Sequence, residues 1–287
     1  MYNRIETRKG AILYSTKNEA SLNIIDKLKR YFYWREEQKD KLYFSPCLKS
    51  DCCTKFYAYG QEKEILQVRP TKSMKEDYFL YASTHKSEKS LKSLTVHIPG
   101  NFSEAKFGGE PKTLNYSFAS KLKQILKLLD EENKKNSLGW NVTMEVDHHG
   151  PTIKEKKPLI FVEIGSSKDE WQEPVAGKIV ASVLFNALLL KAEEYKTYIA
   201  FGGGHYAPKF NDYQLGKKKL NQEEIAISHI CSKYDIEQLD KELVFEAIEK
   251  NLEKIEGALI DKKGLNNKQQ ERLIKILKEV ELNYFFV

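Results

Sequence analysis

Apolar and polar residues alternate along this chain in two periods, and each period predicts a kind of secondary structure. Residues 19–33 carry apolar side chains three and four positions apart, which is typical of an amphipathic helix. Residues 159–164 (LIFVEI) form an almost continuous apolar run, as in a strand buried on both faces. The same criteria predict helices at 118–135, 174–190, 240–254 and 268–280, and strands at 11–16, 41–45, 54–60, 63–69, 78–82, 94–98, 142–146, 198–201 and 258–261.

The order of these elements predicts the fold class. Strands that alternate with helices indicate an α/β fold with a mainly parallel sheet flanked by helices. The helix expected at 174–190 is apolar nearly all round, so it should be central and buried. Residues 1–100 are richer in short strands and predict a smaller N-terminal α/β lobe beside a larger domain at 101–287, unless the two form one integrated domain.

Composition narrows the class of protein. The chain has 287 residues, of which 41% are hydrophobic, and this is enough to build a core and to exclude wholesale disorder. The formal net charge of +6 comes almost entirely from lysine and is weak evidence for a nucleic-acid partner. A charged N-terminus and the lack of an apolar stretch of about 20 residues favour a cytoplasmic protein without membrane contact.

The histidines occupy an informative position relative to the predicted strands. Five of the six lie at or just beyond the carboxyl end of a strand: His85, His97, His148, His149 and His205. In open α/β sheets, ligands bind in the crevice beyond these ends. A single histidine is more often a surface or core residue, but five at strand ends predict a common site.

Two carboxylates belong to the same pattern. Glu163 lies inside the apolar run 159–164, where it must meet a cation, a metal or several donors, or take up a proton. A buried ion pair with a lysine is the alternative interpretation. Glu145 lies on the strand before His148 and has the same ambiguity. Histidine and carboxylate together favour hydrolytic zinc chemistry, although no local motif such as H-E-x-x-H is present.

Motifs that are absent exclude other chemistry. The sequence has no G-x-S-x-G elbow and no G-x-x-x-x-G-K-[ST] loop, which disfavours a serine hydrolase and a P-loop NTPase. Its cysteines include no C-x-x-C pair, so we expect structural or incidental thiols: Cys47, Cys52, Cys53 and Cys231. The run Gly202–Gly204 either lets the backbone approach a ligand closely or simply ends a strand.

Six segments resemble a known family. They are Ser83–His85, Thr95–Asn101 (TVHIPGN), Glu145–Thr152 (EVDHHGPT), Phe161–Ser167 (FVEIGSS) with Trp171, Gly202–Lys209 (GGGHYAPK) and Ser228–Ile230. In order and spacing, from about residue 10 to the C-terminus, they resemble the archaeal and plant-type D-aminoacyl-tRNA deacylases. Asp147 and Phe102 depart from that family's pattern, in which a small polar residue and a tryptophan are usual, but neither replaces a histidine.

The resemblance implies a zinc-dependent hydrolase that cleaves the ester between a D-amino acid and tRNA, as in chiral proofreading of translation. It also implies a fold similar to phosphorylase and peptidyl-tRNA hydrolase. The metal ligands are then expected among His97, His148, Glu163 and His205. Proton transfer is assigned to His149 or Glu145, oxyanion binding to the amides of Gly203 and Gly204, and support of the ligands to His85, His229 and Ser166.

The expected partner is tRNA charged with a D-amino acid; the sequence leaves the oligomeric state open and favours a monomer. Lysines expected to meet tRNA phosphates are Lys86, Lys89, Lys92, Lys209, Lys217 and Lys218. Two alternatives stay open from the residues alone. One is a metal-dependent amidase or peptidase that uses the same histidines on a small substrate. The other is a non-catalytic RNA-binding protein, which the lack of an aromatic-plus-basic signature disfavours.

Overall fold

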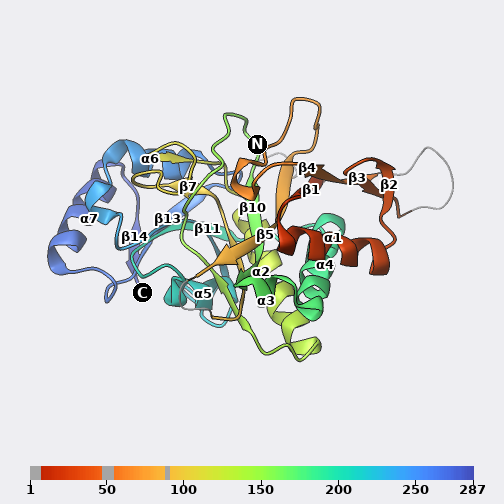
Figure 1. Ribbon diagram of the computed structural model, residues 1–287. Helices are drawn as coiled ribbons and strands as arrows, with labels where there is room; N and C mark the ends of the chain where they lie inside the picture. The colour runs from red at the N-terminus through yellow and green to blue at the C-terminus, as the bar shows by residue number, and fades with distance from the viewer. Residues whose placement is uncertain (1–7, 47–54, 88–90) are drawn as a thin grey trace. The chain divides into compact units, whose positions relative to one another are not determined.

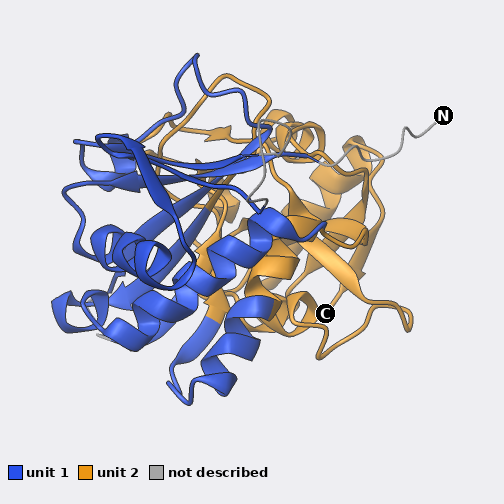
Figure 2. Ribbon diagram, turned by 90° about the vertical axis from the view of Figure 1, so that its right-hand side faces the viewer, with its two compact units in different colours: residues 1–95, 128–142, 161–191 blue, residues 96–127, 143–160, 192–287 orange. Residues whose placement is uncertain are grey.

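The computed structural model describes residues 8–46, 55–87 and 91–287. The chain divides into two compact units, shown in Figure 2: unit 1 comprises residues 1–95, 128–142 and 161–191, and unit 2 comprises residues 96–127, 143–160 and 192–287. Each unit is therefore discontinuous in sequence. The expected division into residues 1–100 and 101–287 stays a prediction, and the two units are described separately below.

Unit 1 is built on strands that begin near the N-terminus. Its elements are β1 (Gly10–Ser15), α1 (Glu19–Tyr31), β2 (Arg35–Gln38), β3 (Lys41–Phe44), β4 (Phe56–Gln61), β5 (Tyr78–Lys86), α3 (Lys168–Trp171) and α4 (Pro174–Leu189). Strand β1 pairs in parallel with both β4 and β5, and the β2–β3–β4 ribbon is antiparallel. The strand order of the whole sheet is β2-β3-β4-β1-β5-β10-β6-β9. Three of those strands and one helix run through both units: β6 (Ser93–His97), β9 (Asn141–Met144), β10 (Leu159–Ser166) and α2 (Ala119–Lys135).

Helices α1 and α4 pack against each other in unit 1, and one side-chain amide fixes their approach. Asn23 Nδ2 donates to the carbonyls of Trp171 and Glu173, both at 2.9 Å. Gly177 leaves room for this side chain, since a Cβ there would lie 2.3 Å from Asn23 Oδ1. The helix expected at 174–190 forms as α4 and is buried along most of its length, as its all-round apolar sequence predicted.

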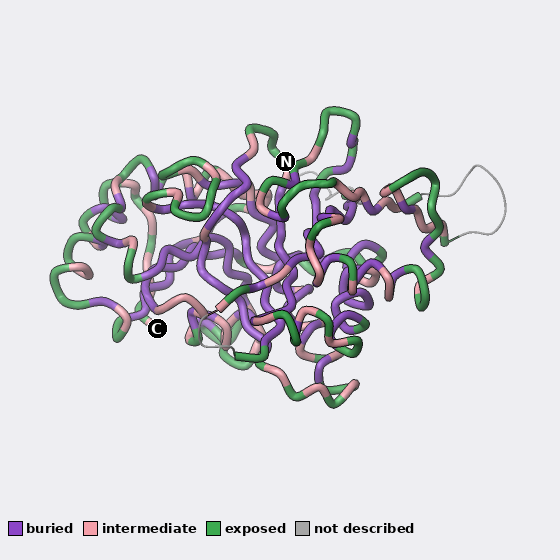
Figure 3. Tube along the Cα trace, in the orientation of Figure 1, coloured by how far each residue is buried: buried purple, intermediate pink, exposed green. Residues whose placement is uncertain are grey.

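Unit 2 contains a parallel sheet of four strands in the order β12-β11-β13-β14. Its elements are β7 (Gly100–Asn101), β8 (Thr113–Leu114), β11 (Lys196–Phe201), α5 (Pro208–Gln214), β12 (Ile225–Cys231), α6 (Lys241–Glu249), β13 (Ile255–Ile260), α7 (Asn267–Glu279) and β14 (Tyr284–Phe286). Figure 1 shows α6 and α7 beside this sheet, and their apolar residues share a core cluster with β11 and β13. The buried trace in Figure 3 follows the strands of both units.

These observations confirm a mixed α/β fold with a large, mainly parallel sheet flanked by helices. The strand expected at 63–69 is wrong, because Ile65–Gln67 forms a 3₁₀ turn and the segment pairs with no strand in the described sheets. Strand β12 was not expected, because Ser228 and His229 interrupt its apolar run.

Cys231 is buried, and burial raises the pKa of its thiol, in agreement with a structural role; Cys47, Cys52 and Cys53 lie outside the described residues. Among the described residues, no helix has the length and apolar character needed to cross a membrane.

Candidate metal centre

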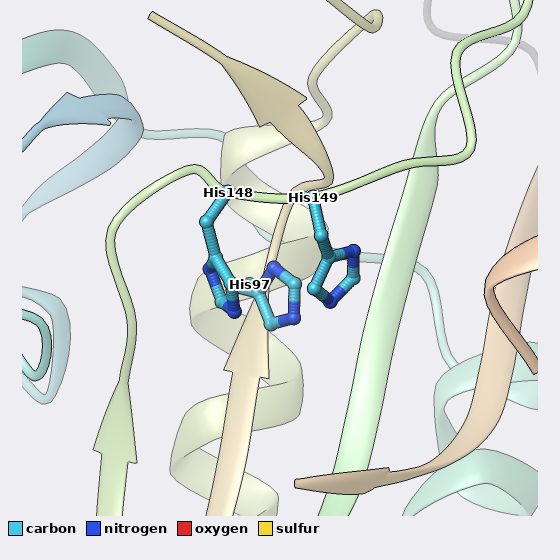
Figure 4. A group of neighbouring side chains, drawn as sticks. All are labelled: His97, His148 and His149. Carbon is cyan, nitrogen blue, oxygen red and sulfur yellow. The ribbon is translucent and has the colours of Figure 1, made fainter. Parts of the chain in front are cut away.

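Three histidines of unit 2 lie with their rings side by side. His97 is the last residue of β6, and His148 and His149 follow β9 (Figure 4). The ring centroid of His97 lies 4.2 Å from that of His148 and 4.7 Å from that of His149, and the rings of His148 and His149 are 4.4 Å apart. One nitrogen from each ring lies within 4.8 Å of the others, which is a spacing that can hold one metal ion.

Backbone pairing within unit 2 explains why these residues meet. The N–H of Glu145 donates to the carbonyl of Val96 at 3.1 Å, and the N–H of Gly100 donates to the carbonyl of His148 at 3.3 Å. The segment that carries the histidine pair is thereby fixed on both sides of His97. A third bond, from the N–H of Val146 to the carbonyl of His205 at 3.0 Å, brings the loop after β11 to the same place.

A buried carboxylate connects two of the imidazoles. Glu145 Oε2 lies 3.4 Å from His148 Nε2 and 3.0 Å from His205 Nε2, and the glutamate side chain is fully buried. His205 is 39% exposed, so the cluster reaches solvent at this residue. Glu145 is thus placed between a ring at the centre of the cluster and a ring at its surface.

The hydrogen bonds of His148 and His149 define which ring nitrogen faces inward. Nδ1 of His148 lies 2.8 Å from the carbonyl of Val146, and Nδ1 of His149 lies 2.5 Å from the carbonyl of Gly150. A carbonyl only accepts, so each Nδ1 carries a proton and each Nε2 keeps its lone pair when the ring is neutral. Burial lowers the pKa of His148 well below its usual value, and the neighbouring His97 and His149 lower it further, so this ring is neutral near pH 7.

A second buried pair fixes the same segment to β12. His229 Nδ1 lies 2.6 Å from Asp147 Oδ2, and His229 Nε2 lies 3.1 Å from the carbonyl of Lys250. The N–H of Ile230 donates to Asp147 Oδ1 at 2.8 Å. Asp147, which departs from the pattern expected of the family, therefore fixes the backbone next to His148 to strand β12. His229 lies inside strand β12.

Asn115 is a structural residue of the site that sequence reasoning missed. Its Nδ2 donates to the carbonyls of Pro99 and Pro151, each at 2.8 Å, and its Oδ1 accepts from the N–H of Ile153 at 2.9 Å. One buried amide thus holds the segment after His97 to the segment after His149. The only sequence signal was a polar residue next to a short apolar pattern, which is too common to single out.

The glycine run forms the loop between β11 and His205. Gly202 and Gly203 have φ values of +104° and +79°, which glycine adopts without strain. The N–H of Gly202 donates to the carbonyl of Cys231 at 2.9 Å, and the carbonyl of Gly203 accepts from the N–H of Lys233 at 3.0 Å. No described atom comes within 4 Å of a Cβ built at Gly204. Oxyanion binding by Gly203 and Gly204 stays a prediction.

Glu163 and His85 belong to unit 1, where the glutamate is surrounded by donors. Ser83 Oγ donates to Glu163 Oε1 at 2.9 Å, Thr95 Oγ1 donates to Oε2 at 3.4 Å, and His85 Nδ1 lies 3.7 Å from Oε2. The carboxylate is 2% exposed, as its apolar surroundings in the sequence predicted. Ser166 is also buried, and its hydroxyl donates to the carbonyl of Leu91 at 2.5 Å.

The lysines assigned to tRNA occupy different settings. Lys86, Lys92 and Lys217 are exposed, and Lys89 lies outside the described residues. Lys218 is half exposed and lies 3.1 Å from Asp212. Lys209 Nζ lies 2.6 Å from Asp261 and donates to the carbonyl of Val287 at 2.8 Å, so its charge is neutralised within unit 2.

The fold and the cluster together define a class of protein: an α/β protein that gathers histidines and a buried carboxylate at and beyond the ends of its strands. Several known proteins are similar to this chain in sequence, and a solved structure is similar to it in fold. A family model described as D-aminoacyl-tRNA deacylase matches residues 72–285. The D-aminoacyl-tRNA deacylase of Pyrococcus furiosus is 33% identical over 285 residues, covering 95% of this chain and 98% of the relative.

Two further comparisons agree with these matches. The D-aminoacyl-tRNA deacylase of Methanosarcina acetivorans is 38% identical over 207 residues, covering 72% of this chain and 66% of the relative. A solved structure described as a conserved protein of unknown function has a TM-score of 0.80 at 24% identity and covers 97% of this chain and 95% of that one, which shows the fold alone. The chain belongs to the D-aminoacyl-tRNA deacylase family, a hydrolase family, and the resemblance inferred from its motifs is confirmed.

Proposed function

We propose that this chain hydrolyses the ester bond between a D-amino acid and the 3′ end of tRNA, releasing both. The observation that carries the proposal is the cluster of His97, His148 and His149 beside Glu145, in a chain of the deacylase family. An ester hydrolase needs a nucleophilic water, a group that accepts its proton, and donors for the oxyanion. The cluster supplies residues that can activate a water and residues that can accept its proton.

The donor set of the cluster fits a zinc ion. His148 presents the Nε2 lone pair of a neutral ring toward the carboxylate Oε2 of Glu145 at 3.4 Å, and two electron-rich atoms in this position favour a cation between or beside them. Nδ1 protons held by backbone carbonyls fix the tautomers of His148 and His149, as is usual for histidines that bind metals. We assign His97, His148 and His149 as the ligands in unit 2. A bound zinc supplies Lewis acidity and makes water a nucleophile near pH 7.

Glu145 and His205 are proposed to move the proton. The carboxylate lies 3.0 Å from His205 Nε2, and His205, at 39%, is the most exposed ring of the cluster. A proton taken up at Glu145 can therefore pass to His205 and leave through its exposed ring, or return to the leaving 3′ oxygen of the ribose. The amides of Gly203 and Gly204 are proposed to bind the oxyanion, as the sequence predicted.

This assignment exchanges two of the roles expected from the sequence. His149 becomes a ligand because its ring lies against those of His97 and His148, and His205 becomes a proton carrier because its ring lies against Glu145. Glu163 is retained as a proposed further ligand on its sequence context and its burial in unit 1. His85 is then proposed to hold Glu163 in place, at 3.7 Å from Oε2.

The test is hydrolysis of D-tyrosyl-tRNA and L-tyrosyl-tRNA by the purified protein, with and without a chelator. We expect fast loss of the D ester only, abolished by chelation and restored by zinc. Binding of tRNA is expected to weaken as salt is raised, because lysine–phosphate contacts release counterions. Failure to cleave the D ester in buffer with added zinc would exclude the proposed activity. Cleavage of small peptides or amides under the same conditions would then favour a metal-dependent amidase.

A further inference from the structure

Two strongly exposed aromatic side chains lie on loops of unit 2 that contact the histidine-bearing segments. Phe107 is 69% exposed and Tyr234 is 71% exposed. Exposing a whole aromatic ring to water forgoes the stabilisation that burial would give it. Neither residue is used by the proposed hydrolysis, and the positions of both are fixed by the hydrogen bonds of their loops.

The loop of Phe107 is fastened to the segment that follows His149. Asn101 Nδ2 donates to the carbonyls of Gly108 and Glu110, each at 3.1 Å, and the N–H of Gly150 lies 3.5 Å from the carbonyl of Phe107. Gly109 and Gly150 face each other so closely that a Cβ on Gly150 would lie 2.4 Å from the N of Gly109. The backbone of Phe107 is therefore held next to the residue after His149, and its exposed ring is carried by a loop that is bonded on both sides.

The loop of Tyr234 is fastened in the same way to the glycine loop before His205. The N–H of Lys233 donates to the carbonyl of Gly203 at 3.0 Å, and the N–H of Tyr234 bonds the hydroxyl of Ser232 at 3.2 Å. Asp235 accepts from the hydroxyl of Ser103, which joins this loop to the loop of Phe107. The two aromatic rings thus belong to one connected framework around the metal centre.

An exposed lysine precedes each aromatic residue in the sequence, Lys106 before Phe107 and Lys233 before Tyr234. Lys233 Nζ lies 5.1 Å from the ring centroid of Tyr234. Lys154 and Lys156 are exposed on the segment that continues from His149. Exposed aromatic rings with nearby lysines are the pattern by which proteins bind single-stranded nucleic acid, through base stacking and phosphate contacts. An apolar protein partner would not need the lysines.

We propose that Phe107 and Tyr234 are stacking platforms for the unpaired bases at the 3′ end of the tRNA. This inference rests on the proposed function, because the ester of that substrate is carried by the ribose of the terminal nucleotide. The terminal base is attached to the same ribose and must lie within one nucleotide of the reacting carbon. The loop of Phe107 is bonded to Gly150, next to His149, and the loop of Tyr234 is bonded to Gly203, so the two rings are proposed to stack on the terminal base and on the base before it.

The experiment compares Phe107→Ala and Tyr234→Ala with Phe245→Ala. Phe245 is a matched control, since it is 55% exposed in the same unit but lies on α6 instead of a loop that contacts the histidine segments. Steady-state kinetics with D-tyrosyl-tRNA should show KM raised about 5-fold to 100-fold for each platform variant, with kcat little changed. Phe107→Trp and Tyr234→Phe should restore KM, because they retain a ring that stacks.

Binding of uncharged tRNA separates this inference from the proposed function. Wild-type protein should bind intact tRNA more tightly than the same tRNA without its unpaired 3′ nucleotides, and the platform variants should lose this difference. If wild-type protein does not hydrolyse the ester, the proposed function fails while this binding comparison still tests the platforms. The inference is overturned if Phe107→Ala, Tyr234→Ala and Phe245→Ala have equal KM values, or if the platform variants weaken intact and truncated tRNA equally.

Discussion

The two units surround their buried polar groups in opposite ways. In unit 1, the carboxylate of Glu163 accepts hydrogen bonds from the hydroxyls of Ser83 and Thr95. In unit 2, the imidazoles of His97 and His148 stack against each other, and the pKa of His148 is lowered by burial and by its neighbouring histidines. Hydrogen-bond donors around a carboxylate favour its charged form. Burial and neighbouring bases favour the neutral form of an imidazole, which has a free lone pair. The second arrangement leaves imidazole lone pairs that can bind a cation.

Burial also lowers the pKa of two lysines in unit 2. Burial lowers the pKa of Lys121 to about 7, and it lowers that of Lys123 to about 8. Lys123 Nζ nevertheless donates to the carbonyls of Tyr213 and Gln214 at the end of α5, at 3.1 and 2.9 Å. Helix α5 also presents Asn211 Oδ1 to the N–H of Met144, one residue before Glu145. Lys123 thus helps, through α5, to position the segment that carries His148 and His149.

The largest expected effect comes from removing a base of unit 2. His148→Ala should lower kcat for the D ester by more than about 100-fold and reduce bound zinc, because loss of a ligand exceeds the 10-fold to 100-fold cost of losing a residue behind a ligand. His85→Ala, a histidine of unit 1, serves as the comparison and should fall within that smaller range. For both variants, elemental analysis measures the zinc content and single-turnover hydrolysis measures the rate. Equal effects of the two changes would contradict the distinction drawn between the units.

The next effect concerns the acid of unit 1. Glu163→Gln keeps the acceptor for Ser83 but replaces the oxygen that faces Thr95 and His85 with a donor. We expect the free energy of unfolding to fall by about 1–3 kcal/mol, because a charged acceptor is lost in a buried place. Zinc content should fall as well, since Glu163 is proposed as a ligand. Chemical denaturation and elemental analysis read the two effects separately. Full zinc content in a destabilised variant would leave Glu163 a purely structural residue.

The smallest effect is a change in pH dependence. The folded pKa of Lys123 is about 8, below the usual 10.5, so between these values the unfolded chain binds more protons and stability rises with pH. From pH 8 to pH 9.5 this group should contribute about 2 kcal/mol of increase in the free energy of unfolding. Lys123→Met should remove that part of the slope, whatever its effect on stability at one pH. Denaturant titrations of both proteins across this range measure it. Parallel curves would show that Lys123 keeps an ordinary pKa.

Much of the fold followed from local pattern. The helix at 174–190 and the strand at 159–164 were predicted because their apolar residues repeat with the periods of a helix and of a buried strand. The strand at 225–231 was missed because Ser228 and His229 are polar residues inside it, paired with Asn251 and Asp147. A polar residue that finds its partner only through the fold makes a buried strand look like a loop.

The candidate site was predicted in its location more fully than in its roles. The strand-end pattern grouped His97, His148 and His205, whose rings lie close together in unit 2, but it gave no reason to choose between His149 and His205 as a ligand. That choice depends on which ring lies against Glu145. The platforms Phe107 and Tyr234 carried no signal, because the sequence separates them by more than a hundred residues.

The sequence by itself determined the family, the α/β class and the residue types of the site, since motifs such as HHGPT and GGGHYAPK and the periods of apolar residues are local properties of the chain. Only the tertiary structure decided which imidazoles share a centre and what faces them. Pairing of Asp147 with His229 and of Asn115 with Pro99 and Pro151 connects segments far apart in sequence. Protonation and ligand capacity follow from such neighbours, because burial and nearby charge, more than residue identity, set the pKa of an imidazole.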